Sequence, residues 1–435
     1  MNIELKNLSI IHDSVKESDG LYLPDFKFNV FKLRHTFEDL LGISESEHSL
    51  LKEKNIKRLL SDRGCMEPKN IIHFTIDSLG YNQINKNNGF FDKYYLNNEV
   101  IQLSSVFPTI TSTIMSSIHS GLPPEVHGLL GHKIYFPEIG NIIDTLNLNV
   151  PNAYDRKKDA LIKSGINPKV LMWKYNPPSW QNTEDYKQYN FLNTNIAMSG
   201  LSHFMLEPDS VIPFRNYIDG LEKIRKLLKR KEKFYIHFYI GDVDDLSHGY
   251  GPFSEEFSKG LNLIEYILSN FLMSLKKEIG EETLISISAD HGQNTIEEEK
   301  QIILKEEDVE KLQRLCYAPM GKSGRILHFY AKKEMENKLE AFLNEKISEA
   351  GLVTHWNNKL KSLFSCNENF GRLKERLGEI MVLLKPNYSL EQEKLNTNQT
   401  QLFDKRLKGH HGSLSKDELI VPFIIDKISN FKSYL

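Results

Sequence analysis

Apolar runs of strand length alternate with amphipathic stretches of helix length through the central part of this chain of 435 residues. Residues 70–76, 234–240 and 283–289 predict buried strands, and residues 217–231 and 254–279 carry apolar side chains at helical spacing. Sustained alternation of this kind is typical of an α/β fold. We therefore expect a mostly parallel central sheet flanked by helices.

The beginning and the end of the sequence show other patterns. Residues 21–31 alternate like strands, and residues 35–43 and 48–60 predict helices. We expect the whole of residues 1–68 to be a packing extension without chemistry. Near the other end, residues 418–425 predict a last strand that rejoins the main sheet.

The region after about residue 300 predicts a small inserted domain. Residues 297–315 are charged and are expected to be helical, and a strand at 324–331, a helix at 335–351 and a strand at 379–385 follow. Residues 387–409 form a long polar connection. The predicted division is an N-terminal extension (1–68), a core (69–297 plus 405–435), and an inserted α+β cap domain with its polar connection (298–404).

Composition and charge exclude several classes of protein. Hydrophobic residues make up 40% of the chain, and the net charge of −3 lacks the basic field of an extended nucleic-acid surface. No apolar run approaches the roughly eighteen residues of a membrane span, and the first residues lack a signal-peptide pattern. Cys65, Cys316 and Cys366 are too few for a disulfide framework. We expect a cytoplasmic protein that does not enter a membrane, and its oligomeric state stays open.

Acidic and histidine residues follow three of the predicted strands directly. They are Asp77 after residues 70–76, Asp244 and His248 after residues 234–240, and Asp290 and His291 after residues 283–289. Because strand ends of an open α/β sheet meet at one crevice, we expect these side chains to converge. The spacing of Asp244 and His248 places both on one face of a helical turn; Asp242 and Asp245 are the alternatives to Asp244. Mixed carboxylate and imidazole ligands are typical of a catalytic zinc site.

Two further segments supply a hydroxyl group and a late histidine. Thr111 begins a predicted helix of small residues, and Thr109 is the alternative hydroxyl. His411 lies in a Gly-His-His-Gly sequence, in which His410 is the alternative ligand. A hydroxyl group is a poor nucleophile at neutral pH, but coordination to a metal ion can activate it. Together with the acidic residues, these segments predict a metal site next to a nucleophile.

In order along the chain, the motifs are an Asp after the first strand, Phe-Pro-Thr-x-Thr, Asp-x-x-x-His, Asp-His-Gly and Gly-x-His-Gly. This set resembles the alkaline phosphatase superfamily, and most closely its nucleotide pyrophosphatase/phosphodiesterase branch, over about residues 69–297 and 405–426. The insertion lies where related enzymes carry a cap. The resemblance implies two metal sites, one held by Asp244, His248 and His411 and the other by Asp77, Thr111, Asp290 and His291. It also implies that Thr111 is the nucleophile and forms a phospho-threonine intermediate.

The function expected from the resemblance is that of a two-metal phosphodiesterase or nucleotide pyrophosphatase. Zinc suits the mixed ligands best, and such sites also tolerate manganese or iron. The expected substrate is a small phosphorylated molecule such as a nucleotide. Phosphonate or phosphomonoester hydrolysis on the same scaffold is the alternative, although no arginine is evident near Thr111. A further alternative is an inactive metal-binding interaction module.

One departure from the family pattern concerns the substrate. Relatives usually carry an asparagine three residues after the nucleophile, where this chain has Ile114, and the neighbouring Thr113 is a candidate replacement. Trp173 and Tyr175, in a segment that ends at Trp180, are candidates to stack on a base or to cover the crevice. A packing role is the alternative for these aromatic residues.

Overall fold

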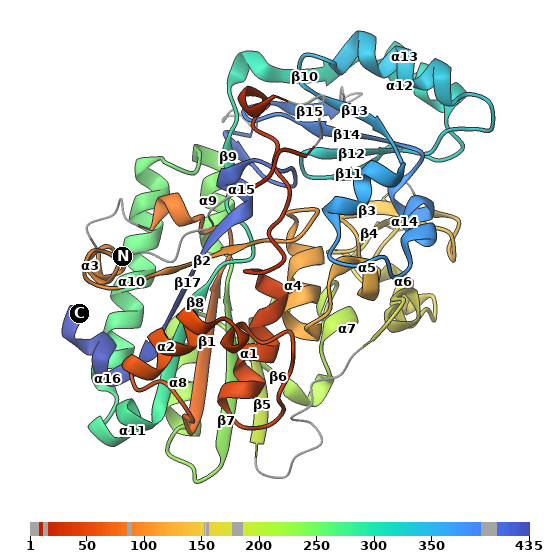
Figure 1. The fold of residues 1–435 in the computed structure, drawn as a ribbon. Helices are drawn as coiled ribbons and strands as arrows, with labels where there is room; N and C mark the ends of the chain where they lie inside the picture. The colour runs from red at the N-terminus through yellow and green to blue at the C-terminus, as the bar shows by residue number, and fades with distance from the viewer. Residues whose placement is uncertain are drawn as a thin grey trace, which may run out of the picture.

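A computed structural model of the chain describes residues 8–11, 16–84, 89–151, 153, 156–175, 186–392 and 407–435. Its main feature is a seven-stranded sheet in the order β2-β17-β8-β1-β7-β5-β6 (Figure 1). The strands are β2 (Ile101–Ser104), β17 (Ile420–Lys427), β8 (Thr283–Ser288), β1 (Asn70–Ile76), β7 (Lys233–Ile240), β5 (Tyr186–Asn193) and β6 (Val211–Phe214). β8, β1, β7, β5 and β6 pair in parallel, whereas β17 is antiparallel to both of its neighbours. The predicted α/β fold with a mostly parallel sheet is confirmed.

Helices cover both faces of this sheet. On one face, Phe37 of α1 (Leu33–Leu40) contacts His73 of β1, and His119 of α4 (Thr111–Ser120) contacts His237 of β7. On the other face, α8 (Tyr217–Leu227) packs against Phe238 of β7 and against α10 (Glu255–Ser274). Because successive side chains of a strand point to opposite faces, β1 and β8 are buried along their whole length.

The N-terminal extension packs against α4 through α1 and the 3₁₀-helix at Val30–Lys32. The predicted helices of this extension are confirmed as α1 and α2 (Lys54–Asp62), but the prediction of strands at 21–31 was wrong. There the Asp25 side chain accepts hydrogen bonds from the N–H groups of Lys27 and Phe28, so the chain turns instead of extending. The segment then enters a 3₁₀-helix at Val30–Lys32.

A second sheet of six antiparallel strands has the order β13-β14-β12-β11-β3-β4 and lies at the upper right of Figure 1. Its strands are β13 (Gly351–His355), β14 (Ile380–Leu384), β12 (Ile326–Phe329), β11 (Gly321–Ser323), β3 (Lys133–Phe136) and β4 (Asn141–Asp144). The predicted strand–helix–strand pattern is confirmed by β12, α13 (Glu336–Ile347) and β14. However, β3 and β4 come from outside residues 298–404, so the insertion does not build this sheet alone.

One part of the insertion differs from its prediction. Within the expected helical segment, residues Gln301–Leu304 form strand β10, which pairs in parallel with β15 (Ser389–Gln392). Two adjacent isoleucines at 302 and 303 favour a strand. Helix α12 (Glu306–Leu315) begins only after this strand.

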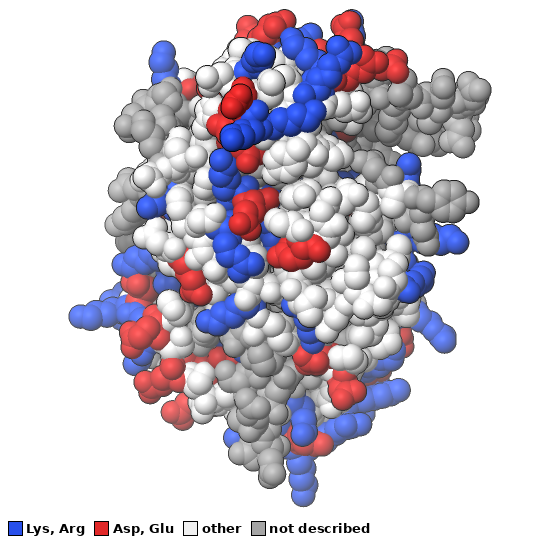
Figure 2. All heavy atoms as spheres, turned by 90° about the vertical axis from the view of Figure 1, so that its right-hand side faces the viewer, with Lys and Arg blue, Asp and Glu red and all other residues white. Residues whose placement is uncertain are grey.

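Basic and acidic side chains lie interspersed on the face shown in Figure 2. They form a band beside a broad area of uncharged side chains. Basic groups of this face therefore lie next to acidic ones. No helix among the described residues is long and apolar enough to cross a membrane.

A buried ion pair joins the extension to the C-terminal end of α4. The Arg34 guanidinium lies 3.0 Å from Glu38 Oε1 and also donates to the carbonyl oxygens of His119 and Ser120. Replacing Arg34 with Met leaves a buried carboxylate and these carbonyl groups without this donor. We expect Arg34→Met to lower the free energy of unfolding by about 3–5 kcal/mol in denaturant titrations.

Two control variants separate this loss from a general effect of substitution. Adding Glu38→Leu to Arg34→Met removes the uncompensated charge and should recover part of the stability. Lys259→Ala, in an exposed ion pair with Glu255 on α10, should change the stability by less than about 1 kcal/mol. A loss for Lys259→Ala as large as that for Arg34→Met would contradict this account.

Three buried histidines between α4 and the central sheet predict instability in acid. Burial lowers the pKa of His73 and of His119 to about 3, and lowers the pKa of His237 well below its usual value. Between pH 6.5 and about 3, the unfolded chain binds protons that the folded protein excludes, so the free energy of unfolding falls as the pH falls. His119→Phe should reduce this slope by at most about 1.4 kcal/mol per pH unit. Denaturant titrations at several pH values, with a chelator in all samples, measure the pH dependence of the free energy of unfolding. An unchanged slope in His119→Phe would contradict a lowered pKa of His119.

Candidate active site

The carboxyl ends of three neighbouring strands bring the predicted acidic residues together. β1 pairs in parallel with both β7 and β8, so these strands end at one edge of the sheet. Asp77 follows β1, and its N–H donates to the carbonyl of Ile240 at the end of β7. Asp244 lies in α9 (Asp242–Tyr250), directly after β7, and Asp290 follows β8. The convergence expected from the strand ends is therefore present in the fold.

Asp77, Asp290 and His291 form the first cluster of metal-binding side chains. One ligand atom of each lies within 4.8 Å of the others. His291 Nε2 lies 3.5 Å from Asp77 Oδ1, 3.4 Å from Asp290 Oδ2 and 3.1 Å from Thr111 Oγ1. Ligands of a tetrahedral zinc ion, at bond lengths near 2.1 Å, are separated by about 3.4 Å. The three distances from His291 Nε2 thus match the separation of ligands around one metal ion.

The carboxylates of this cluster each keep one oxygen free. Asp77 Oδ2 accepts a hydrogen bond from the Tyr239 hydroxyl, and Asp290 Oδ1 accepts from the N–H groups of Ser78 and His291. Asp77 Oδ1 and Asp290 Oδ2 are buried and have no hydrogen-bond partner among the described residues. Buried polar atoms are normally paired, so these two oxygens fit a metal ion.

Asp244, His248 and His411 form the second part of the site. His248 Nε2 lies 3.4 Å from Asp244 Oδ2, and His411 Nε2 lies 3.8 Å from Asp244 Oδ1. The Nδ1 atoms of the two histidines lie 2.9 Å from the carbonyl oxygens of Gly409 and Thr109. A carbonyl partner places the proton on Nδ1 and leaves Nε2 free for a metal ion.

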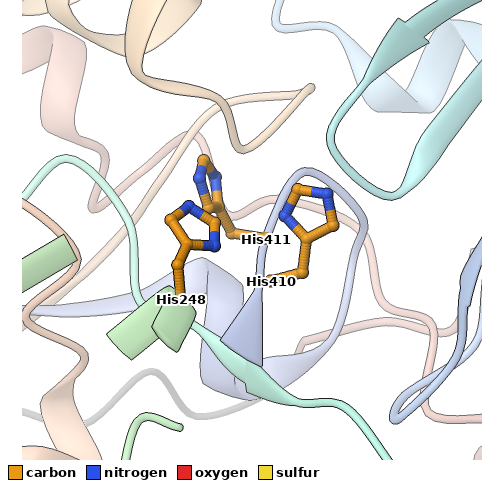
Figure 3. Close-up of side chains that lie close together, drawn as sticks. All are labelled: His248, His410 and His411. Carbon is orange, nitrogen blue, oxygen red and sulfur yellow. The ribbon is translucent and has the colours of Figure 1, made fainter. Parts of the chain in front are cut away.

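His410 is buried beside this second part of the site (Figure 3). Nitrogens of His248, His410 and His411 lie within 4.8 Å of one another, and the rings of His410 and His248 meet edge to face. His410 belongs to the short strand β16 (Gly409–His410), which pairs with β9 (Asn294–Thr295). The choice of His411 over His410 as ligand stays a prediction.

Burial of several carboxylates at one point shifts their pKa values in opposite directions. Burial and the neighbouring Asp290 and Asp244 raise the pKa of Asp77 well above its usual range, and burial raises that of Asp290 to about 6. Burial acts in the same sense on Asp244, but His248 and His411 outweigh it and lower its pKa. Burial lowers the pKa of His291 to about 4, so this ring is neutral at pH 7 and able to bind a metal ion.

Thr111 is the first residue of α4, and its hydroxyl lies 3.1 Å from His291 Nε2 of the first cluster. Thr109, the alternative nucleophile, is buried; its hydroxyl donates to Ser413 O at 2.7 Å and accepts from Gly412 N at 3.1 Å. Ile114 is part of the hydrophobic core. The Thr113 hydroxyl is buried within α4 and has no partner among the described residues.

A cavity of about 490 Å³ opens beside the site, and Asp77, Thr111 and Asp244 are part of its wall. Asp242 and Asp245, the alternatives to Asp244, also line it, and the sequence reasoning missed the other polar groups, which are His119, His132, Asn147, Lys158, Asn193, Asn195, Ser199, Ser202, Tyr217 and Tyr239. Most come from residues 132–158 and 193–202, where the sequence contains no motif. His119, Tyr217 and Tyr239 come from α4, α8 and β7.

The three residues expected to bind substrate do not line this cavity. Thr113 lies inside α4. The Trp173 ring lies 4.7 Å from the Arg372 guanidinium and 4.8 Å from that of Arg376, and the Tyr175 hydroxyl donates to Glu207. Trp180 is outside the described residues. Their roles in substrate binding stay predictions, to which this geometry adds no support.

Residues 71–414 match the family described as type I phosphodiesterase / nucleotide pyrophosphatase. The match covers both clusters, Thr111 and the cap. The chain belongs to this family. The predicted relation to the nucleotide pyrophosphatase/phosphodiesterase branch is thereby confirmed.

Proteins of similar sequence include phosphodiesterases and nucleotide pyrophosphatases. The chain is 26% identical over 201 residues to a venom phosphodiesterase of Crotalus durissus collilineatus, across 45% of this chain and 22% of that protein. It is 25% identical over 194 residues to ectonucleotide pyrophosphatase/phosphodiesterase family member 1 of Rattus norvegicus, across 43% and 19%. The aligned region is thus about a fifth of the length of each of these relatives.

Solved structures share the fold. Human ectonucleotide pyrophosphatase/phosphodiesterase 5 superimposes with a TM-score of 0.61 at 16% identity, over 82% of this chain and 87% of that one. An inactive threonine-to-alanine variant of the murine protein in complex with AMP superimposes with a TM-score of 0.58 at 14% identity, over the same shares.

The two clusters predict a stoichiometry of two zinc ions per chain. His248→Ala should remove one ion, and Asp290→Ala should remove the other, because each variant takes a ligand from a different cluster. His132→Ala is the matched control, since His132 pairs with Asp144 at 3.0 Å outside both clusters, and it should keep both ions. Metal analysis after dialysis against zinc measures the stoichiometry. Two ions retained by His248→Ala would rule out this assignment.

Proposed function

We propose that this chain is a metal-dependent phosphodiesterase or nucleotide pyrophosphatase in which Thr111 is the nucleophile. The observation that carries the proposal is the position of the Thr111 hydroxyl. It lies 3.1 Å from His291 Nε2, at the point where the first cluster meets the cavity. The family to which the chain belongs supports the same reaction class.

The proposed reaction has two in-line steps at phosphorus. The Thr111 oxygen forms a bond to phosphorus, and the bond to the leaving oxygen breaks, which gives a phospho-threonine. Water then attacks the same phosphorus, breaks the bond to Thr111 and restores its hydroxyl group. Two divalent metal ions, for which zinc suits the ligands best, would favour the ionised hydroxyl and neutralise charge on the phosphoryl oxygens.

The start of α4 supports a bound phosphoryl group in a second way. The first N–H groups of a helix have no partner within it, and the helix dipole adds positive potential at this end. α4 has ten residues and begins at Thr111. Its N-terminal N–H groups are therefore suited to bind the non-bridging oxygens of a phosphoryl group at the nucleophile.

A nucleotide is the proposed substrate class. The cavity has a volume within the range of sites for small molecules. It combines apolar side chains such as Leu192 and Met205 with amide groups from Asn147 and Asn193. A murine relative has been solved in complex with AMP, which supports a nucleoside monophosphate unit as the part retained in the site.

A phosphomonoester or phosphonate hydrolase remains the second candidate. Lys158 gives the cavity one basic side chain that could bind an additional anionic group. No arginine is among the described residues that line the cavity, which favours the diester because a diester carries less charge on its phosphoryl oxygens.

Turnover of two chromogenic esters tests the proposal. The zinc-loaded protein should hydrolyse bis-p-nitrophenyl phosphate faster than p-nitrophenyl phosphate. Thr111→Ala should lower kcat for the diester by at least about a thousandfold, because the covalent step is lost while both clusters keep their acidic and histidine ligands. Preference for the monoester would instead support the second candidate.

Two variants on the same segment serve as controls. Ser116→Ala removes a buried hydroxyl of α4 that donates to Ser112 O within the same helix, so it should leave turnover close to that of the unmodified protein. Thr109→Ala tests the alternative nucleophile. Wild-type turnover by Thr111→Ala, or loss of the covalent intermediate only in Thr109→Ala, would overturn the assignment of Thr111.

A further inference from the structure

Ser78 lies between the two clusters, directly after Asp77 at the end of β1. Its side chain is fully buried. Its backbone has φ +63°, in the left-handed region that non-glycine residues adopt infrequently. Such strained positions occur often at functional sites, where the surrounding contacts hold them. The contacts of Ser78 therefore need an explanation.

The hydroxyl and the N–H group of Ser78 together contact three predicted metal ligands. The hydroxyl donates to Asp244 Oδ1 at 2.5 Å, and the same oxygen lies 3.2 Å from His291 Nδ1. The N–H group donates to Asp290 Oδ1 at 3.3 Å. Asp244 belongs to the second part of the site, whereas His291 and Asp290 belong to the first cluster.

Gln293 also contacts both Ser78 and Asp244. Its buried side chain donates through Nε2 to Asp244 Oδ1 at 2.5 Å and to the Ser78 hydroxyl oxygen at 3.1 Å. Asp244 Oδ1 thus accepts two short hydrogen bonds, which hold the carboxylate in one orientation. Its other oxygen, Oδ2, is the one that lies 3.4 Å from His248 Nε2.

We propose that Ser78, supported by Gln293, is the positioning residue that holds the ligands of both metal sites in one fixed arrangement. The proposal rests on the proposed two-metal function. A hydroxyl group suits this position because it can donate to a carboxylate and accept from an imidazole N–H at the same time. His291 Nδ1 lies 3.2 Å from the Ser78 hydroxyl oxygen and 3.1 Å from the Gly292 carbonyl oxygen, and these two acceptors keep the proton on Nδ1 and leave Nε2 facing Thr111. One small side chain thereby orients a ligand on each side.

The contacts predict different effects for Ser78 and Gln293. Loss of the Ser78 hydroxyl should weaken zinc binding at both sites by about tenfold to a hundredfold, the usual effect of removing a partner of a metal ligand. Gln293→Leu removes only donors to Asp244 and Ser78, so it should weaken chiefly the ion bound by Asp244, His248 and His411. Competition with a chromogenic zinc chelator, without substrate, measures both affinities.

Two substitutions at Ser78 separate the hydroxyl from the backbone conformation. Ser78→Ala and Ser78→Gly both remove the hydroxyl, but glycine also adopts φ +63° without strain. Equal losses of zinc affinity in the two variants support the proposal. Wild-type affinity in Ser78→Gly with a loss in Ser78→Ala would show that only the backbone matters, and would overturn it.

Further measurements exclude a general packing effect. Ser286→Ala removes a fully buried hydroxyl of β8 that no predicted ligand contacts, and it should bind zinc like the unmodified protein. With saturating zinc, Ser78→Ala should lower kcat for the diester more than it changes KM. With cobalt(II) in place of zinc, the visible spectrum of Ser78→Ala should differ from that of the unmodified protein. Wild-type zinc affinity and spectrum in Ser78→Ala would overturn the proposal. If the unmodified protein binds two zinc ions and hydrolyses neither ester, the proposed function fails and the role of Ser78 in metal binding stands.

Discussion

The close approach of three carboxylates, two of them buried, is the constraint on which the whole site depends. Asp77 and Asp290 follow adjoining strands and are buried, and the half-buried Asp244 lies beside them in α9. Bringing like charges into such a place is unfavourable by several kcal/mol per ion unless positive charge is present. Among the described residues, the side chains that contact these carboxylates are histidine, tyrosine, serine and glutamine. These side chains supply little of the compensating charge, and the arrangement fits the binding of divalent cations.

The central sheet was predictable because burial on both faces leaves a strong signal in the sequence. Residues 70–76 correspond to β1 without a change of boundary, and the parallel order of its neighbours follows from the strand–helix alternation. Prediction failed where local hydrogen bonds decide the structure. At 21–31 the Asp25 side chain turns a segment that has the alternation of a strand. At 301–304 the strand pairs with β15, from residues 389–392, a long-range partner that the local pattern does not reveal.

The same distinction applies to the site. Its predicted ligands follow strands or stand in short motifs, so their convergence could be expected from the fold class. Ser78 could not be assigned a role in this way, because its partner Asp244 is 166 positions away and the contact depends on how β1 and α9 are packed. The lining of the cavity was even less predictable, since Lys158 and Asn193 belong to segments whose sequence contains no motif. Motifs predict metal ligands well because metal binding restricts the residue types. The shape of the cavity and the contacts that orient the ligands depend instead on tertiary packing.

The cap and the metal site are joined through the loop that carries His411. The N–H group of Arg325, at the entry to β12, donates to the carbonyl of His411, and its guanidinium lies 2.5 Å from Glu418 in a pair buried from solvent. Glu418 in turn accepts hydrogen bonds from the N–H groups of Ser413 and Ser415. A buried ion pair of this kind is a weak source of stability but a strong restraint on geometry, because a misplaced partner leaves a charge uncompensated. The segment around β12 is therefore part of the scaffold that sets the position of His411.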